Sequence, residues 1–353
     1  MLFGIAVGLS VLCLIILVHE LGHFAAAKVC GVKVEAFSLG FWKVLWSFSY
    51  HGTEYRLSVI PLGGYVLMKG ETKTEGSDER ICERDSYPGC GFARKVLILL
   101  AGPLANACLA YMCSILFLML GSTIALPVVG SVDQGSIAAV AGVKTGDRIV
   151  KLEGTRIDTW NEFARMSLFA EGNRRLIVER NGTTVELTAA FPEKVDHTKL
   201  SEAIWKPMGL TQNGQQEWYQ PGLVEALEKS FRFIGSASQV IVTSLWWLIS
   251  GDIPLSNLNG PVMIVKVTGD IAALGRTVLL GFVAFLSLNV GLMNLLPVPV
   301  MDGGQIVLVT IEAIRRKAFS AKTIERLSWA SLAALGCLTL FTLVNDIRLL
   351  LKM

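Results

Sequence analysis

Charged residues are scarce in this sequence of 353 residues, of which Asp, Glu, Lys and Arg make up only 17%. A soluble chain of this size usually carries about a quarter. Hydrophobic residues account for 52%, which indicates membrane spans rather than an unusually large core. The net charge of +3 gives no reason to expect a nucleic-acid partner.

The sequence also lacks a disulfide framework and a cysteine metal site. None of its seven cysteines form a Cys-x-x-Cys pair, and most lie in or beside apolar runs, where cysteine acts as a small hydrophobic residue. Cys82 and Cys90 could pair, but free thiols fit the pattern better.

Lys and Arg are absent before the first apolar run, which argues against a secretory signal peptide. Four runs approach the roughly 20 residues that a bilayer requires. They are residues 2–18, continuing through two histidines, and residues 96–120, 278–300 and 327–344. A fifth candidate, residues 234–250, is shorter and more polar, so it could span or lie at the interface.

Two segments between these runs predict folded structure outside the spans. Residues 34–41 and 54–68 resemble strands, with a bend or bulge at Gly63 and Gly64, and a charged loop follows them. Residues 121–191 alternate strand-like runs with turns, which predicts one small domain of strands with one or two helices.

Basic residues predict the orientation of the chain. Lys28 and Lys33 follow the first run, and residues 315–326, between the third and fourth runs, include five Lys and Arg side chains. By the positive-inside rule both loops are cytoplasmic, so the amino terminus and the small domain lie outside.

The first run ends in His19-Glu20-Leu21-Gly22-His23, the pattern H-E-x-x-H. On a helix the two histidines share a face one turn apart, so both can bind one Zn²⁺. Glu20 then lies where it can take a proton from a metal-bound water. The alternative is a pair of interfacial histidines ending a span, but ionisable groups inside membranes are usually functional.

A zinc site of this type needs a third protein ligand and an open position for water. His51 and His197 are poor candidates, because they lie in the strand-rich segment and in the outer insertion. The stretch NLLPVPVMDGGQ, residues 294–305, contains prolines that must break the helix, and broken helix at membrane depth survives only around a cavity. Asp302 is its only acidic residue and is therefore the candidate ligand; capping of the next helix is the alternative.

The direction of the spans provides a check. With one span between them, the first and third runs are parallel, and the histidines meet Asp302 on the cytoplasmic side. If residues 234–250 also crossed, Asp302 would lie on the far face. The metal-site hypothesis therefore predicts that residues 234–250 do not cross.

The second run opens with LLAGPLANA, in which Gly102 and Pro103 loosen the helix and Asn106 supplies a polar group. Close packing of small residues and a role beside the site both remain open for this motif.

Taken together, the motifs resemble those of the site-2 protease family of intramembrane zinc metalloproteases, and most closely its bacterial RseP-like members. H-E-L-G-H, G-P-x-x-N and N-x-x-P-x-P-x-x-D-G-G occur in the family's order, and the likeness runs from end to end. The segment GSVDQGSIAAVAGVKTGDRIVKLEGTRI is similar to a PDZ domain of this family, with a single copy here.

This resemblance implies the roles of the candidate residues. The implied zinc ligands are His19, His23 and Asp302, and the implied catalytic base is Glu20. Residues 34–68 are similar to the family's membrane β-loop, to which an unwound substrate would add as a strand. The residues that we assign to substrate binding are Asn294, Asn106, Gly63 and Gly64.

The expected fold is an α-helical polytopic membrane protein with four transmembrane helices, a membrane-associated β-loop and a PDZ-like α+β domain. The expected parts are a first span 1–24, a β-loop and linker 25–95, a second span 96–120, a PDZ domain 121–192, a post-PDZ region with an amphipathic helix 193–277, a third span 278–305, a cytoplasmic loop 306–326 and a fourth span 327–350.

The resemblance also implies the function. We expect zinc-dependent cleavage of transmembrane segments in single-pass membrane proteins, such as an anti-sigma factor or signal-peptide remnants, in the bacterial inner membrane with the PDZ domain in the periplasm. Expected partners are these substrates and membrane lipid, with peptide or substrate contact at the PDZ domain. The alternatives are an inactive PDZ-bearing scaffold, which the intact motifs disfavour, and a metal transporter, whose ligands would lie spread along a path.

Overall fold

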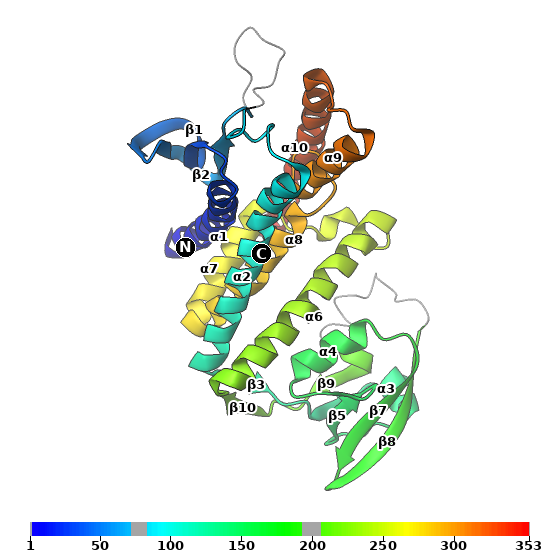
Figure 1. Ribbon diagram of the computed structural model, residues 1–353. Helices are drawn as coiled ribbons and strands as arrows, with labels where there is room; N and C mark the ends of the chain where they lie inside the picture. The colour runs from blue at the N-terminus through cyan, green and yellow to red at the C-terminus, as the bar shows by residue number, and fades with distance from the viewer. Residues whose placement is uncertain (1, 72–82, 193–205, 353) are drawn as a thin grey trace. The chain divides into compact units, whose positions relative to one another are not determined.

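The computed structural model describes residues 2–71, 83–192 and 206–352, and the chain divides into two compact units (Figure 1). Unit 1 comprises Met1–Met119, Gly222–Trp246 and Pro254–Met353, and unit 2 comprises Leu120–Pro221 and Trp247–Ile253. Cys82 and His197 lie outside the described residues, so the pairing considered for Cys82 stays open.

Unit 1 is built from long helices and one pair of strands. Its elements are α1 (Leu2–Val29), β1 (Val34–Tyr50), β2 (Thr53–Met68), α2 (Phe92–Leu120), most of α6 (Leu223–Ser250), a short 3-10 turn (Leu255–Asn257), α7 (Pro261–Leu274), α8 (Arg276–Asn294), α9 (Asp302–Arg315) and α10 (Ala321–Lys352). The last four residues of α6, 247–250, belong to unit 2.

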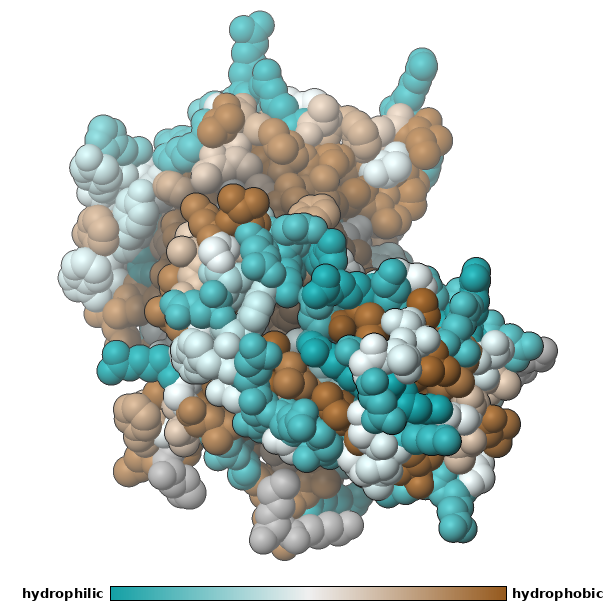
Figure 2. Space-filling view, turned by 90° about the horizontal axis from the view of Figure 1, so that it is seen from below, coloured by the Kyte–Doolittle hydropathy of each residue, from teal (hydrophilic) through white to brown (hydrophobic). Residues whose placement is uncertain are grey.

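Within the described residues, five helices are long and apolar enough to cross a membrane, namely α1, α2, α6, α8 and α10. The expectation of four is therefore not confirmed, and the additional helix is α6. Its 28 residues begin well before the segment 234–250 that the sequence indicated. Figure 2 shows hydrophobic residues exposed over part of one face of the molecule, as a chain that meets lipid requires.

Helix α1, which carries the two histidines, and α8, which precedes the break before Asp302, are parallel. Val11 and Ile15 of α1 pack against Val283 and Leu286 of α8, and both sequences rise in the same direction toward the candidate ligands. Helix α2 is antiparallel to α8, because Gly291 lies against Pro103 whereas the earlier Gly281 lies against the later Phe117.

Helix α7 lies within residues 193–277, the region in which the sequence predicted an amphipathic helix. It runs antiparallel to α1, since Gly269 lies against Gly4 and Val265 lies against Gly8. Helix α7 has 14 residues and is not among the helices long and apolar enough to cross a membrane. That residues 234–250 do not cross therefore stays a prediction, while the structure brings Asp302 and the two histidines together.

Strands β1 and β2 are bent, so each contributes two segments to the sheet. Residues 36–39 pair with residues 54–57 on one side and with residues 64–67 on the other. The chain bends where Gly40 and Trp42 have positive φ, and the register shifts again before Gly64, where the sequence predicted a bend or bulge. Beyond residue 40 every residue of β1 is exposed, including the large rings of Trp42, Trp46 and Phe48.

Unit 2 has the strands and two helices that the sequence predicted for residues 121–191. Its elements are β3 (Ser122–Ala125), β4 (Val129–Val132), α3 (Ile137–Ala141), β5 (Arg148–Leu152), β6 (Thr155–Arg156), α4 (Trp160–Leu168), β7 (Gly172–Arg180), β8 (Thr183–Phe191), a 3-10 turn (Pro207–Gly209), β9 (Leu210–Gln212) and β10 (Gln216–Tyr219).

Four strands of unit 2 form a sheet in the order β6-β5-β7-β8, and Phe163 of α4 is fully buried in its core. Asp147 is also buried, and Arg180 donates two hydrogen bonds of 2.7 Å to its carboxylate, which satisfies the buried charge. Because β9 pairs with β4 and β10 pairs with β3, the unit extends past residue 192, where the sequence placed its end.

Candidate metal centre

The three candidate ligands meet in unit 1. His19 and His23 lie one turn apart on α1, and Asp302 is the first residue of α9. The Nε2 atoms of the two histidines are 3.2 Å apart. His19 Nε2 is 3.1 Å from Asp302 Oδ2, and His23 Nε2 is 3.4 Å from Asp302 Oδ1. Both histidines are buried, and one ligand atom from each of the three residues lies within 4.8 Å of the others.

These distances fit a zinc ion. Ligands about 2.0–2.2 Å from a tetrahedral metal are separated from one another by roughly 3.3–3.5 Å. Asp302 Oδ2 is buried and makes no hydrogen bond to any described residue, although His19 Nε2 lies 3.1 Å away. Two ring nitrogens beside a buried carboxylate oxygen that lacks a hydrogen bond form the donor set of a metal site.

Backbone breaks give Asp302 its position. Helix α8 ends at Asn294, and α9 begins only at Asp302, as the prolines in this stretch require. A Cβ atom on Gly303 would collide with the carbonyl oxygen of Leu295, and one on Gly304 with that of Val298. The close return of the chain therefore requires both glycines.

Helix α2 fixes the orientation of both imidazoles. The carbonyl oxygen of Ile98 lies 2.8 Å from His23 Nδ1, so this nitrogen carries the proton and Nε2 keeps its lone pair for a metal. Asn106 is fully buried with its amide 3.3 Å from His19 Nδ1, and its Oδ1 lacks a partner among the described residues. The amide orientation that satisfies both groups points Oδ1 at His19 Nδ1–H.

Gly102 provides the space in which the nitrogens converge. A Cβ atom at this position would collide with His23 Nε2 and would lie 2.8 Å from His19 Nε2. The sequence indicated close packing at Gly102 but not that the group packed against it is the metal site.

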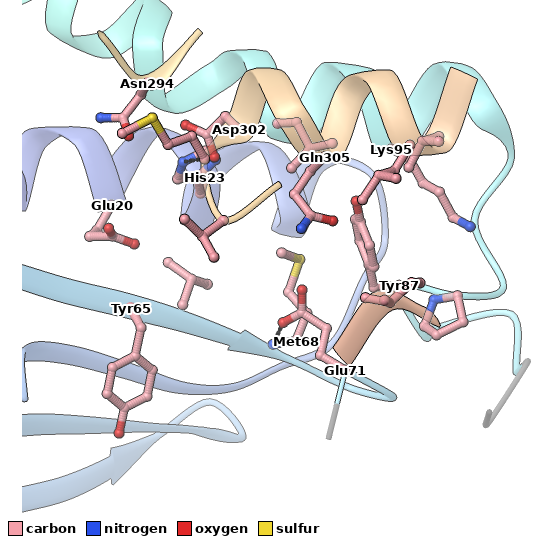
Figure 3. Close-up of a pocket in the computed structure, with 18 of the residues that line it drawn as sticks. Glu20, His23, Tyr65, Met68, Glu71, Tyr87, Lys95, Asn294, Asp302 and Gln305 are labelled. Carbon is pink, nitrogen blue, oxygen red and sulfur yellow. Dashed lines mark hydrogen bonds and ion pairs between the residues drawn. The ribbon is translucent and has the colours of Figure 1, made fainter. Parts of the chain in front are cut away.

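The ligands open into a cavity of about 970 Å³ in unit 1. In Figure 3, Glu20, His23, Asp302 and Asn294 gather at one end of it. Glu71, Tyr87, Lys95 and Gln305 lie at the other end; none of these was singled out by the sequence.

Burial shapes the electrostatics at this second end. It raises the pKa of the Glu71 carboxyl to about 7, although Glu71 Oε2 accepts a hydrogen bond from the Met68 backbone N–H. Burial likewise raises the pKa of the Tyr87 hydroxyl, so this group stays protonated in the physiological range.

The four residues assigned to substrate binding lie in different places. Asn294 and Gly64 line the cavity, and a Cβ atom on Gly64 would lie 3.0 Å from Glu20 Cγ. Gly63 has a φ of 145° and packs against the ring of Phe41, whereas Asn106 lies behind His19. The structure thus brings only Asn294 and Gly64 to the cavity wall.

The chain is similar to known proteins over nearly its whole length. Peptidase family M50 matches residues 7–338. The chain is 34% identical over 339 residues to a zinc metalloprotease of Campylobacter jejuni, covering 96% of this chain and 91% of that protein. It is 33% identical over 353 residues to a zinc metalloprotease of Helicobacter pylori, covering 98% and 99%, and 28% identical over 431 residues to the regulator of sigma E protease of Haemophilus influenzae, covering 95% and 96%.

This chain belongs to peptidase family M50 and is a zinc-dependent metalloendopeptidase.

Proposed function

We propose that the enzyme cleaves peptide bonds within the transmembrane segments of single-pass membrane proteins. The observation that carries the proposal is the place of the donor set: it converges at the ends of α1 and α9, and α1 is long and apolar enough to span a bilayer. A helix inside lipid has its peptide groups shielded by their own hydrogen bonds, so its cleavage requires a hydrated, polar cavity of this kind.

In this proposal His19, His23 and Asp302 hold the zinc ion. When bound, zinc acts as a Lewis acid that lowers the pKa of a coordinated water and polarises the scissile carbonyl. Glu20 lines the same cavity and accepts the proton of the attacking water. It then transfers this proton to the leaving amide nitrogen, so that cleavage yields a carboxylate and an amine.

The sheet next to Glu20 supports a mode of substrate binding. Gly64 and Tyr65 of β2 line the cavity beside Glu20, and residues 64–67 form an outer segment of the paired strands. An unwound substrate would add along this segment as a further strand, with its main chain held by hydrogen bonds. Asn294 would contact the substrate from the opposite wall, whereas the place of Asn106 favours a role in orienting His19.

Unit 2 and the charge distribution support the remaining parts of the proposal. The four-stranded sheet with α3 and α4 fits a PDZ-like domain, which would contact peptides or exclude bulky substrates. The basic residues 315–326 favour a cytoplasmic α9–α10 turn, with unit 2 on the periplasmic side of a bacterial inner membrane. The likeness to a regulator of sigma E protease favours regulated proteolysis of an anti-sigma factor, although signal-peptide remnants fit the same site.

Two substitutions separate metal binding from catalysis. Glu20→Gln should lower the rate of cleavage by about 10²–10⁴-fold and leave the zinc content unchanged, because Glu20 moves the proton without holding the metal. Asp302→Asn should lower both zinc content and activity. The measurements are elemental analysis of purified protein and cleavage of a tagged single-pass substrate in proteoliposomes; full activity and zinc content in Asp302→Asn would refute the assignment of Asp302.

A further inference from the structure

The turn between α9 and α10 gathers basic side chains that the catalytic site does not use. We refer to these residues as the basic turn: Arg315, Arg316, Lys317, Lys322 and Arg326. All of them are exposed, and none forms an ion pair with a carboxylate among the described residues. Five exposed cations, none of them in a direct ion pair with a described carboxylate, make a positive surface.

Acidic groups near the basic turn point elsewhere. Glu312 and Glu325 both line the cavity that holds the candidate metal centre, and Glu312 Oε1 accepts a 2.8 Å hydrogen bond from the Phe319 backbone N–H. Glu312 is therefore held toward the cavity, and Glu325 lies at the cavity's exposed edge, while the five basic side chains lie at the surface.

Contacts within the turn hold some of its side chains in place. The Arg315 guanidinium lies over the ring of Phe319, 4.9 Å from its centre, and Ser320 Oγ accepts a hydrogen bond from the Thr323 backbone N–H at the start of α10. A guanidinium stacked in this way keeps its N–H edges available for a phosphate.

Exposed apolar side chains place the turn at the level of lipid headgroups. Val307, Ile311 and Ile314 of α9 recur at helical spacing, with 43%, 36% and 77% of their surfaces exposed. On α10, Trp329 follows the basic turn directly and is 66% exposed. Apolar side chains that end in a cluster of cations and a tryptophan are typical of the boundary between acyl chains and headgroups.

We propose that the basic turn binds the headgroup of an anionic phospholipid. Three exposed cations at the end of α9 and two in the first turns of α10 can contact the phosphate from two sides, while the apolar faces of both helices contact its acyl chains. The proposal requires only that α10 lies in a membrane, so it does not depend on the proposed proteolytic function.

The test is a lipid titration of the purified full-length protein in detergent, with binding measured by native mass spectrometry. The probes are dioctanoyl-phosphatidylglycerol and the zwitterionic dioctanoyl-phosphatidylcholine. We expect the anionic lipid to bind about tenfold or more tightly, and raising the salt concentration should weaken this preference.

The variant Arg315→Gln/Arg316→Gln/Lys317→Gln should lose the preference, because each cation near an anionic surface contributes severalfold to affinity. The variant Lys322→Gln/Arg326→Gln, which removes the cations on the α10 side of the turn, should weaken the preference for the anionic lipid. The matched control is Lys144→Gln/Arg148→Gln/Lys151→Gln, which removes three exposed cations from unit 2 and should leave the preference intact.

Several results would overturn the proposal. They are equal binding of the two lipids, an undiminished preference in both basic-turn variants, or equal loss in the unit 2 control. Soluble glycerophosphate distinguishes the source of the phosphate: if it displaces the lipid at equal concentration, the turn recognises free phosphate and the proposal of a lipid site is wrong.

Discussion

At the scale of single residues, the most demanding position is Gly102, whose missing side chain makes room for two imidazoles. Gly102→Ala should abolish stoichiometric zinc binding, because its Cβ would collide with His23 Nε2. The measurement is zinc content by elemental analysis. Gly336→Ala in α10 is the matched control, since a Cβ there meets no atom within 4 Å. Normal zinc content in Gly102→Ala would show that the ligands do not converge as described.

Asn106 acts at the same scale through His19. Asn106→Ala should weaken zinc affinity by about 10–100-fold, because the outer partner that orients His19 is lost. Asn106→Asp, which keeps an oxygen toward His19 Nδ1, should retain most of the affinity. Competition with a zinc chelator measures both constants; equal affinities in wild type and Asn106→Ala would leave Asn106 with a packing role only.

Glu71 gives the protein a dependence on pH. Its carboxyl has a pKa of about 7 in the folded state, raised by burial from the ordinary value of 4.5. The stability that this group contributes is therefore complete below about pH 4.5 and is lost as the pH rises through 7.

The glutamine in Glu71→Gln cannot ionise, so this variant should keep the same stability as the pH rises. Between pH 5 and pH 8, wild type should lose stability relative to Glu71→Gln. Because Glu71 is partly exposed to solvent, the loss is smaller than its shift in pKa alone implies. Thermal unfolding of chelator-treated protein in detergent at pH 5, 6.5 and 8 checks this. If the unfolding temperatures of the two proteins change with pH in the same way, the pKa of Glu71 is at its ordinary value.

At the scale of secondary-structure elements, α7 depends on a side chain from α10. Its N-cap, Gly260, has no side chain, and the fully buried Asp346 accepts hydrogen bonds from the backbone N–H groups of Gly260 and Met263. Asp346→Ala should lower the free energy of unfolding by about 1–3 kcal/mol, because two buried donors lose their acceptor.

Thermal unfolding in detergent measures this loss as well. Thr339→Ala on the same helix is the control, since its exposed hydroxyl bonds only to Leu335 of α10. Equal unfolding temperatures for Asp346→Ala and the control would remove Asp346 as the cap of α7.

The elements differ in how well the sequence predicted them. Runs with a strong apolar pattern gave α1, α2, α8 and α10, and the prolines at 297 and 299 gave the break between α8 and α9. The sequence indicated the end of α6 at Ser250 but not its early start, and it could not show that Asp346, which lies far away in the chain, accepts hydrogen bonds at the start of α7. The extension of unit 2 to β9 and β10 was missed for the same reason, since short strands are fixed by their partners.

The sequence likewise predicted some residues of the candidate site and not others. The spacing of His19 and His23 predicted a shared face, and Asp302 was found as the only acidic residue in a broken helix. The cavity's second end, with Glu71 and Tyr87, carries no local pattern, because its residues come together only through the tertiary fold.

At the scale of the whole molecule, we propose that a donor set near the end of an apolar helix serves to cut peptide bonds inside the membrane. Membrane-spanning helices alone would also fit a transporter or a scaffold. A single cavity that holds the three ligands, Glu20 and the edge of β2 favours an endopeptidase.

The most direct test is to map the cut. A single-pass substrate with a truncated outer domain is incubated in proteoliposomes with wild type or with Glu20→Gln, and the new termini are identified by mass spectrometry. We predict one product, formed only by wild type, whose new terminus lies within the substrate's transmembrane segment. A cut in a loop outside the membrane, or the same product from Glu20→Gln, would contradict the account.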